Sequence, residues 1–214
     1  MNKKVLMIFT VGLLAAPIGA MASVTVTQGS SAPTYTTMLN FDEAGGPTGS
    51  VPTNAWAGIG IASLNAGDGN PLVDDWATVT GQPWLGAGNS FFGNFGVFIN
   101  FDGDVSEMSL QAWDPSGAPS PFGGGFGVFA FDDGVEVASY IGTPAYGGFG
   151  DEWYNIVGTD GMVFDEVRLV GFGFSPETFV DNLSWNRPVP VPGALVLLAS
   201  GLAGLGFLKR GKAA

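Results

Sequence analysis

Residues 125–141 read Gly-Phe-Gly-Val-Phe-Ala-Phe-Asp, then Asp133-Gly134, then Val-Glu-Val-Ala-Ser-Tyr-Ile. Two runs rich in aromatic and β-branched residues flank an Asp-Gly pair, which favours a two-residue hairpin turn because glycine accepts a positive φ. This stretch therefore predicts a β-hairpin, and the runs on either side of it extend the same fold class.

Other runs alternate apolar and polar residues with a period of two, as half-buried strands do. They cover residues 36–42, 90–101, 105–113, 162–174 and 179–185. No window of helical length has apolar residues at the spacing of an amphipathic helix, apart from the two terminal segments. About eight strands without helices predict an all-β fold, a two-sheet β-sandwich of the jelly-roll type.

The first 22 residues have the pattern of a secretory signal peptide. A basic start precedes an apolar run over residues 5–16, and Ala20-Met21-Ala22 fits the small-x-small rule of signal peptidase. The mature chain is expected to begin at Ser23, and the alternative is an uncleaved anchor. Because the chain has no cysteine, an exported domain would depend on its core rather than on disulfides.

The last 27 residues, 188–214, combine a proline-rich stem, an uncharged run and a basic tip. The stem is extended because proline fits neither a regular helix nor a central strand. The uncharged run over residues 193–208 suffices for about 24 Å of helix, which is short for a permanent membrane span. The basic tip would hold the end of the chain on the cytoplasmic side. The two interpretations are an ordinary tail anchor and a sorting signal.

This tail closely resembles the PEP-CTERM sorting signal, which marks exported proteins of Gram-negative bacteria, many of them producers of exopolysaccharide. The resemblance implies passage through the inner membrane, recognition by an exosortase-type membrane protease, and delivery to the cell surface or to an extracellular matrix such as a biofilm. Val191 stands where the family motif has Glu, which leaves cleavage of the tail open. The matching positions are Val189, Pro190, Val191, Pro192, Gly193, Lys209 and Arg210.

The segment between the two ends, residues 23–187, is expected to form one domain. Residues 23–186 contain all 19 acidic residues and a single basic residue, Arg168. One positive charge against 19 negative ones leaves a formal charge of −18. Nucleic acid is therefore excluded as a partner, because phosphate binding needs a positive face.

The sequence offers little for catalysis. It has no histidine and no cysteine, which excludes the common triads, thiol enzymes and imidazole metal sites. Paired carboxylates support glycoside hydrolysis in some enzymes, but 19 acidic residues place some pair at a suitable spacing in any fold. The chain is accordingly expected not to be an enzyme, and a carboxylate-based glycoside hydrolase is the least favoured function.

Residues 41–43 and 179–185 resemble the first and last strands of jelly-roll domains in lectins and carbohydrate-binding modules. In several of these families the two strands lie side by side, and an Asp of the last strand helps to hold a structural calcium ion. The resemblance implies calcium as the one expected cofactor. A second acidic stretch, residues 102–107, has half of a calcium-loop pattern, with a plain acidic turn as the alternative. The implied calcium ligands are Asp42, Glu43, Asp181 and Asn182. The alternative for Asp181 is that it caps a turn or faces solvent.

Three of the six tryptophans, Trp84, Trp113 and Trp153, lie beside turns, where an aromatic face can stack on a sugar ring. The alternative is that each covers the core beneath a loop. Trp56 and Trp185 lie in apolar or strand-like surroundings and are expected in the core.

Together these features predict an exported, non-enzymatic β-sandwich that contacts exopolysaccharide. Its other expected partners are signal peptidase and an exosortase-type protease. The alternative function is that of a purely structural matrix or surface-layer component, in which cations bridge acidic faces.

Overall fold

The computed structural model describes residues 22–43, 46, 48–80, 88–113, 125–142, 153–172 and 177–188. These residues form strands linked by turns, one 3₁₀ turn η1 (Ala57–Ile59) and one short helix α1 (Trp76–Thr80). The strands are β1 (Val24–Gly29), β2 (Thr37–Leu39), β3 (Gly49–Ser50), β4 (Ile61–Ala66), β5 (Leu72–Asp74), β6 (Ser90–Asn94), β7 (Val97–Val105), β8 (Glu107–Trp113), β9 (Gly125–Asp132), β10 (Val135–Gly142), β11 (Trp153–Gly158), β12 (Phe164–Phe172) and β13 (Glu177–Asn186).

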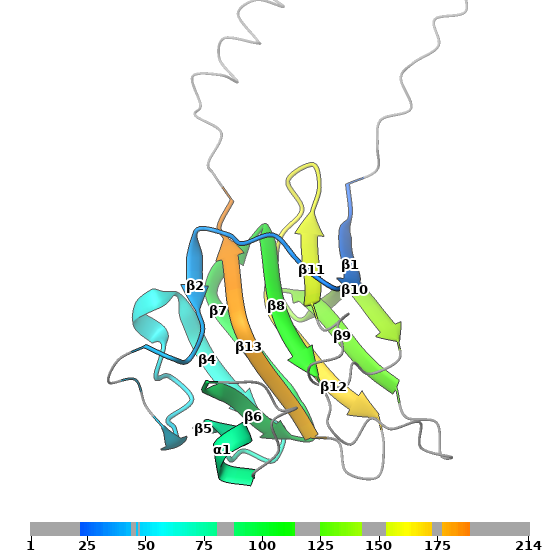
Figure 1. Ribbon diagram of the computed structural model, residues 1–214. Coiled ribbons are helices and arrows are strands. Elements are labelled where there is room, and N and C mark those ends of the chain that lie inside the picture. Colours follow the sequence, from blue (N-terminus) through cyan, green and yellow to red (C-terminus); the bar gives the residue numbers. More distant parts are fainter. Residues whose placement is uncertain are drawn as a thin grey trace, which may run out of the picture.

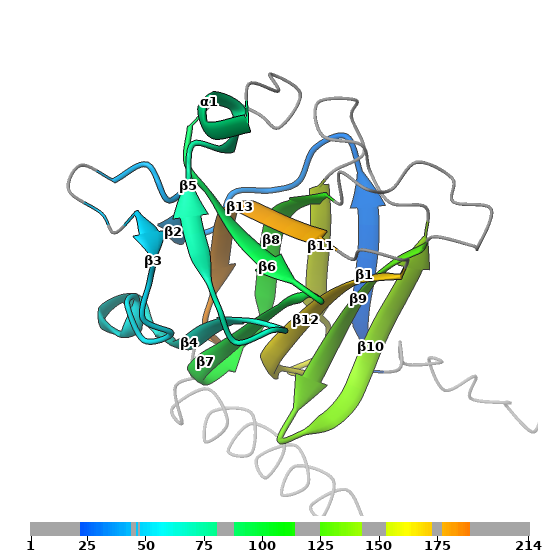
Figure 2. The same ribbon diagram turned by 90° about the horizontal axis from the view of Figure 1, so that it is seen from below.

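The strands form two antiparallel sheets that face each other (Figures 1 and 2). Sheet A has the order β1-β11-β8-β13-β6-β5-β3, with β2 also paired to β13. Sheet B has the order β10-β9-β12-β7-β4. The prediction of an all-β fold built from two sheets is confirmed. The strands β1, β3, β4, β5 and β11 and the short helix α1 were not predicted from the sequence.

The predicted hairpin is present as β9 and β10. Asp133 and Gly134 form its turn with φ values of 49° and 78°, and Asp132 pairs with Val135 across it. Both turn residues thus have the positive φ of the turn type that matches the twist of two antiparallel strands. The local sequence was sufficient to predict this hairpin, because its turn and its pairing involve residues that are close together in the sequence.

The expected single strand over residues 90–101 is wrong, because the chain turns at Phe95 and Gly96 into a different sheet. These two residues have φ values of 60° and 109°, and they separate β6 in sheet A from β7 in sheet B. A Cβ atom at position 96 would lie 2.5 Å from the carbonyl oxygen of Leu169, so glycine is required there. β6 and β7 both contribute apolar side chains to the core between the sheets, so the apolar pattern of the sequence continues through the turn.

The core lies between the sheets and is built from the inward-facing side chains of both. Trp56 and Trp185 belong to it, with exposed fractions of 8% and 1%, as predicted. Burial of a large apolar side chain contributes about 1.5–3 kcal/mol, which suits a domain without cysteine. Fully buried members include Ile99, Leu110, Val128, Ile156 and Leu169.

Both ends of the described chain lie at the same end of the domain. Each strand in the series β1, β11, β8, β13 is antiparallel to the next. The first residue of β1 and the last residue of β13 therefore lie at the same end of sheet A (Figure 1). The backbone N–H of Ser106 donates to the carbonyl of Asn186 there, and the backbone N–H of Thr159 donates to that of Ser23. We call this end the tail side and the opposite one the far end.

The predicted signal peptide, apart from Ala22, and the predicted sorting tail, apart from Pro188, lie outside the described residues. No helix within the described ranges has the length and apolar composition needed to cross a membrane.

Candidate functional site

Two of the three candidate tryptophans lie on neighbouring strands of sheet A, toward the far end. Trp153 begins β11 and pairs with Gln111 of β8, and Trp113 lies two residues further along β8. Paired residues of antiparallel strands project to the same face, as do residues two apart in a strand. The two indoles therefore share the outer face of sheet A. The third candidate, Trp84, lies outside the described residues.

Trp113 is buried in a small aromatic cluster on this outer face. Its ring stacks on that of Phe179, with centroids 5.7 Å apart and planes at 10°, and Phe92 and Trp76 complete the cluster. Trp76 belongs to α1, and its indole N–H donates to the carbonyl of Ser90 over 3.0 Å. With 3% of its surface exposed, Trp113 has no free ring face. The structure thus favours the core-covering role for Trp113, whereas Trp153 is only half-buried.

Asp181 and Asn182 form a bulge in the middle of β13. Asn182 has a φ of 50°, and the pairing between β13 and β8 shifts register between Asp181 and Ser184. The backbone N–H of Asn182 donates to Asp181 Oδ1 over 2.6 Å, and its side-chain amide donates to Asp181 Oδ2 over 3.1 Å. The same amide donates to Gln111 Oε1 over 2.9 Å. Gln111 lies opposite Trp153 in the neighbouring strand, so it lies between the bulge and that indole.

Asp181 is 9% exposed, and the pKa of its carboxyl is raised to about 7. Burial is the main cause, because removal from water penalises the charged form. The hydrogen bond from the Asn182 N–H lowers the pKa, while repulsion from the carboxylates of Asp42 and Glu43 raises it further. Three of the four predicted calcium ligands therefore interact electrostatically in the folded protein.

This proximity follows from the pairing of β2 with β13, in which Leu39 lies opposite Leu183. The chain leaves β2 through Phe41, whose φ is 61°, and reaches Asp42 and Glu43. Among the residues that the structure describes, no three carboxylates lie close enough to hold a metal ion. β2 and β13 are paired, but residues 41–43 follow β2 without belonging to a strand, and the first strand of the described chain, β1, pairs with β11 instead. Calcium binding stays a prediction.

The acidic stretch over residues 102–107 lies at the tail side, where two of its three carboxylates have protein partners. Asp102 pairs with Arg187, and Glu107 accepts a hydrogen bond of 2.8 Å from the side-chain amide of Asn186. Glu107, Asn186 and Arg187 also line a pocket of about 410 Å³ together with Thr36 and Ser106. These contacts favour the plain acidic turn over a calcium loop.

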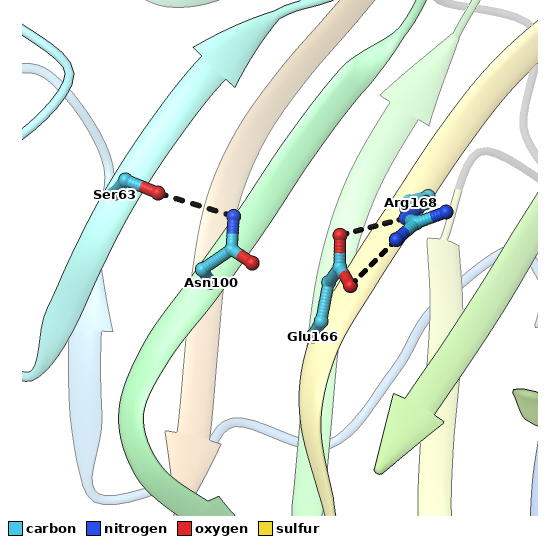
Figure 3. A network of polar contacts seen from close by, with 4 residues as sticks. All are labelled: Ser63, Asn100, Glu166 and Arg168. Carbon is cyan, nitrogen blue, oxygen red and sulfur yellow. Dashed lines mark hydrogen bonds and ion pairs between the residues drawn. The ribbon is translucent and has the colours of Figure 1, made fainter. Parts of the chain in front are cut away.

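The outer face of sheet B carries a second group of aromatic and polar side chains, which the sequence analysis did not single out. Phe98 of β7 and Phe129 of β9 each pair with Arg168 of β12 and are half-buried. Figure 3 shows how Arg168 is held by Glu166, through hydrogen bonds of 2.6 Å and 2.8 Å. The alternation of residues 162–174 and Arg168, the one basic residue of residues 23–186, were visible in the sequence, but the cross-strand partners were not.

Two further residues complete this face. Asn100 pairs with Glu166 and donates from its side-chain amide to Ser63 Oγ of β4 over 3.1 Å (Figure 3). Phe131 pairs with Glu166 on the other side, and the guanidinium carbon of Arg168 lies 4.1 Å from the centre of its ring. We call Phe98, Phe129, Phe131, Arg168, Glu166 and Asn100 the sheet B platform.

Comparison with known proteins gave no match, since no protein-family model, curated protein or solved structure matches this chain.

Proposed function

We propose that this chain is an exported, non-enzymatic β-sandwich of the jelly-roll type. Its tail resembles the PEP-CTERM signal and sorts it to the cell surface or extracellular matrix of a Gram-negative bacterium. Signal peptidase and an exosortase-type protease process its two ends, and the folded domain contacts exopolysaccharide.

The observation that carries this proposal is the placement of the two chain ends. β1 begins and β13 ends at the tail side, so a membrane attachment at either terminus leaves the far end pointing outward. Trp153 lies at that far end on an outer face and retains exposed surface. The half-buried indole and its polar neighbour Gln111 offer an apolar face beside a hydrogen-bonding group, the combination that a sugar ring needs.

Export and sorting are tested by the intact mass of the protein recovered from the native host. Cleavage at both ends removes residues 1–22 and the basic tip with Lys209 and Arg210. A mature species that still carries the basic tip would make the chain a membrane-anchored protein without exosortase processing.

Glycan contact is tested by co-sedimentation of the purified domain with exopolysaccharide from the native host. Trp153→Ala is expected to weaken retention roughly tenfold, by analogy with nucleic-acid bases, whose stacking on an aromatic side chain contributes about 1–3 kcal/mol. Met38→Ala is the matched control, since Met38 is 53% exposed on β2 of the same sheet but lies nearer the tail side. Equal retention of the wild type and Trp153→Ala would overturn this role of Trp153.

The alternative, a purely structural matrix component, is favoured by the charge of −18 over residues 23–186. Such faces repel one another until cations bridge them. Calcium-dependent self-association in the absence of any glycan, with no retention on exopolysaccharide, would support this alternative over the proposed function.

A further inference from the structure

We propose that the sheet B platform binds a neutral polysaccharide chain that lies across the strands. This inference rests on the proposed function and deepens it. It names a second face of the domain that contacts exopolysaccharide and the class of polysaccharide that binds there.

The platform presents aromatic rings where a sheet exposed only to water usually carries polar side chains. Phe98, Phe129 and Phe131 project outward from β7 and β9 and are each half-buried. Ile141 of β10 extends the same face and is 66% exposed. A contiguous patch of exposed apolar side chains marks a binding surface more often than apolar side chains that are exposed one at a time.

The spacing of the rings suits an extended glycan. Phe98 and Phe129 lie opposite Arg168 from either side, on strands that are two strand spacings, about 10 Å, apart. This distance is comparable to the length of a disaccharide unit in an extended chain. The two rings can therefore contact alternate sugars, with the guanidinium between them.

Polar groups of the platform are fixed in place before any ligand binds. Glu166 holds two nitrogens of the Arg168 guanidinium, whose side chain remains 41% exposed. The ring of Phe131 supports the same guanidinium from below. An arginine held in this way loses little conformational entropy on binding and can donate from Nη1 to a sugar hydroxyl. The Asn100 amide is fixed similarly by Ser63.

The charge of the domain selects a neutral ligand. A polyanion would meet the field of the −18 segment, and a second copy of this chain would bring the same charge. The one arginine of the platform is already neutralised by Glu166, so it provides no free positive charge for an anionic polymer. Neutral sugar rings instead match the aromatic faces with their C–H surfaces and the guanidinium with their hydroxyls.

The experiment is affinity electrophoresis of the purified domain in gels that contain a neutral mixed-linkage β-glucan, a neutral galactomannan or anionic alginate. Phe98→Leu and Phe129→Leu retain apolar volume but remove the flat ring, and each is expected to weaken binding to a neutral polysaccharide at least tenfold. Val135→Ala, at the exposed hairpin of the same sheet, is the control and should bind as the wild type does. Melting temperatures show whether each variant is folded.

The outcomes separate this inference from the proposed function. Undiminished binding by both leucine variants, together with loss in Trp153→Ala, overturns the platform and leaves the proposed function standing. Binding to alginate alone overturns the neutral ligand. A wild-type dimer that Phe98→Leu converts to a monomer identifies the face as a contact between copies. Absence of binding to these polymers and to exopolysaccharide from the native host overturns the proposed function itself.

Discussion

The carboxylate of Asp42 accepts a hydrogen bond of 2.7 Å from the backbone N–H of Asn89, and the side-chain amide of Asn89 donates to the carbonyl of Phe41. These residues join two strands that use the same edge of β13. β2 pairs with residues 183–185, and β6 pairs with residues 177–180. The Asp42–Asn89 contact therefore links β2 to β6 beside the bulge of β13, where neither strand pairs with β13.

Asp42→Ala should lower the free energy of unfolding by about 1 kcal/mol, the usual contribution of a hydrogen bond at an exposed site. Urea unfolding followed by tryptophan fluorescence measures this loss. Asp104→Ala is the control, because it removes the same charge from an exposed position on β7. Equal losses in the two variants would show that charge, and not the contact with Asn89, determines the effect.

Trp113→Ala should destabilise the domain by about 3–5 kcal/mol, as expected for truncation of a buried indole. Trp153→Ala should cost much less, because Trp153 is half-buried at the start of its strand. Chemical unfolding of both variants in parallel tests the contrast. A small loss in Trp113→Ala would mean that its cluster with Phe179 contributes little, and would return Trp113 to the candidate ligand contacts.

The parts of the fold that depend on neighbouring residues were predictable from the sequence. The hairpin at Asp133 and Gly134 is an example, since an Asp-Gly pair between two strand-like runs determines both the turn and the pairing. The break at Phe95 and Gly96 was not predictable, because the contact that requires glycine at position 96 is with the carbonyl of Leu169, more than 70 residues away. A phenylalanine at positive φ gives no local turn signal.

The same distinction applies to the candidate site, where the burial and pKa of individual residues depend on parts of the chain that are distant in sequence. The burial of Trp113 depends on α1, which brings Trp76 over a strand distant in sequence. The raised pKa of Asp181 likewise depends mainly on its burial, with a further contribution from Asp42, which follows β2 in the sequence. A sequence shows which residues are aromatic or acidic, whereas exposure and electrostatic environment are set by tertiary packing.

Stability should fall as pH rises between about 4 and 7, through Asp181. Its pKa is about 7 in the folded protein and about 3.9 in an unfolded chain. Between these values the folded state retains a proton that the unfolded chain has lost, so the free energy of unfolding decreases and then stays at its lower level above pH 7. The difference corresponds to roughly 2–4 kcal/mol.

Asp181→Asn should remove this contribution, because the amide remains neutral at every pH. The stability of this variant relative to the wild type, measured in buffer with a chelator, should rise between pH 4 and pH 7. Taking the difference cancels the general repulsion among the other carboxylates. Parallel profiles of the wild type and Asp181→Asn would show that Asp181 ionises normally in the folded protein.

Calcium should stabilise the domain more than sodium at matched ionic strength. Asp42, Glu43, Asp181 and Asn182 provide hard oxygen ligands at the junction of β2 and β13, and calcium accepts six to eight such ligands. Extracellular modules bind calcium at about 10⁻⁴–10⁻³ M, and a site present only in the folded state contributes about 2.7 kcal/mol at roughly 100 times its Kd. Thermal unfolding in millimolar calcium measures the gain.

The gain should also depend on pH and on Asp181. Calcium binds the ionised carboxylate, so its effect should be larger at pH 8 than at pH 5, on opposite sides of the pKa of Asp181. Asp181→Ala should abolish the difference between calcium and sodium, while Asp104→Ala should retain it. Because the two salts would screen exposed charges alike, equal melting temperatures in calcium and sodium would mean that screening alone acts and that the proposed site binds no ion.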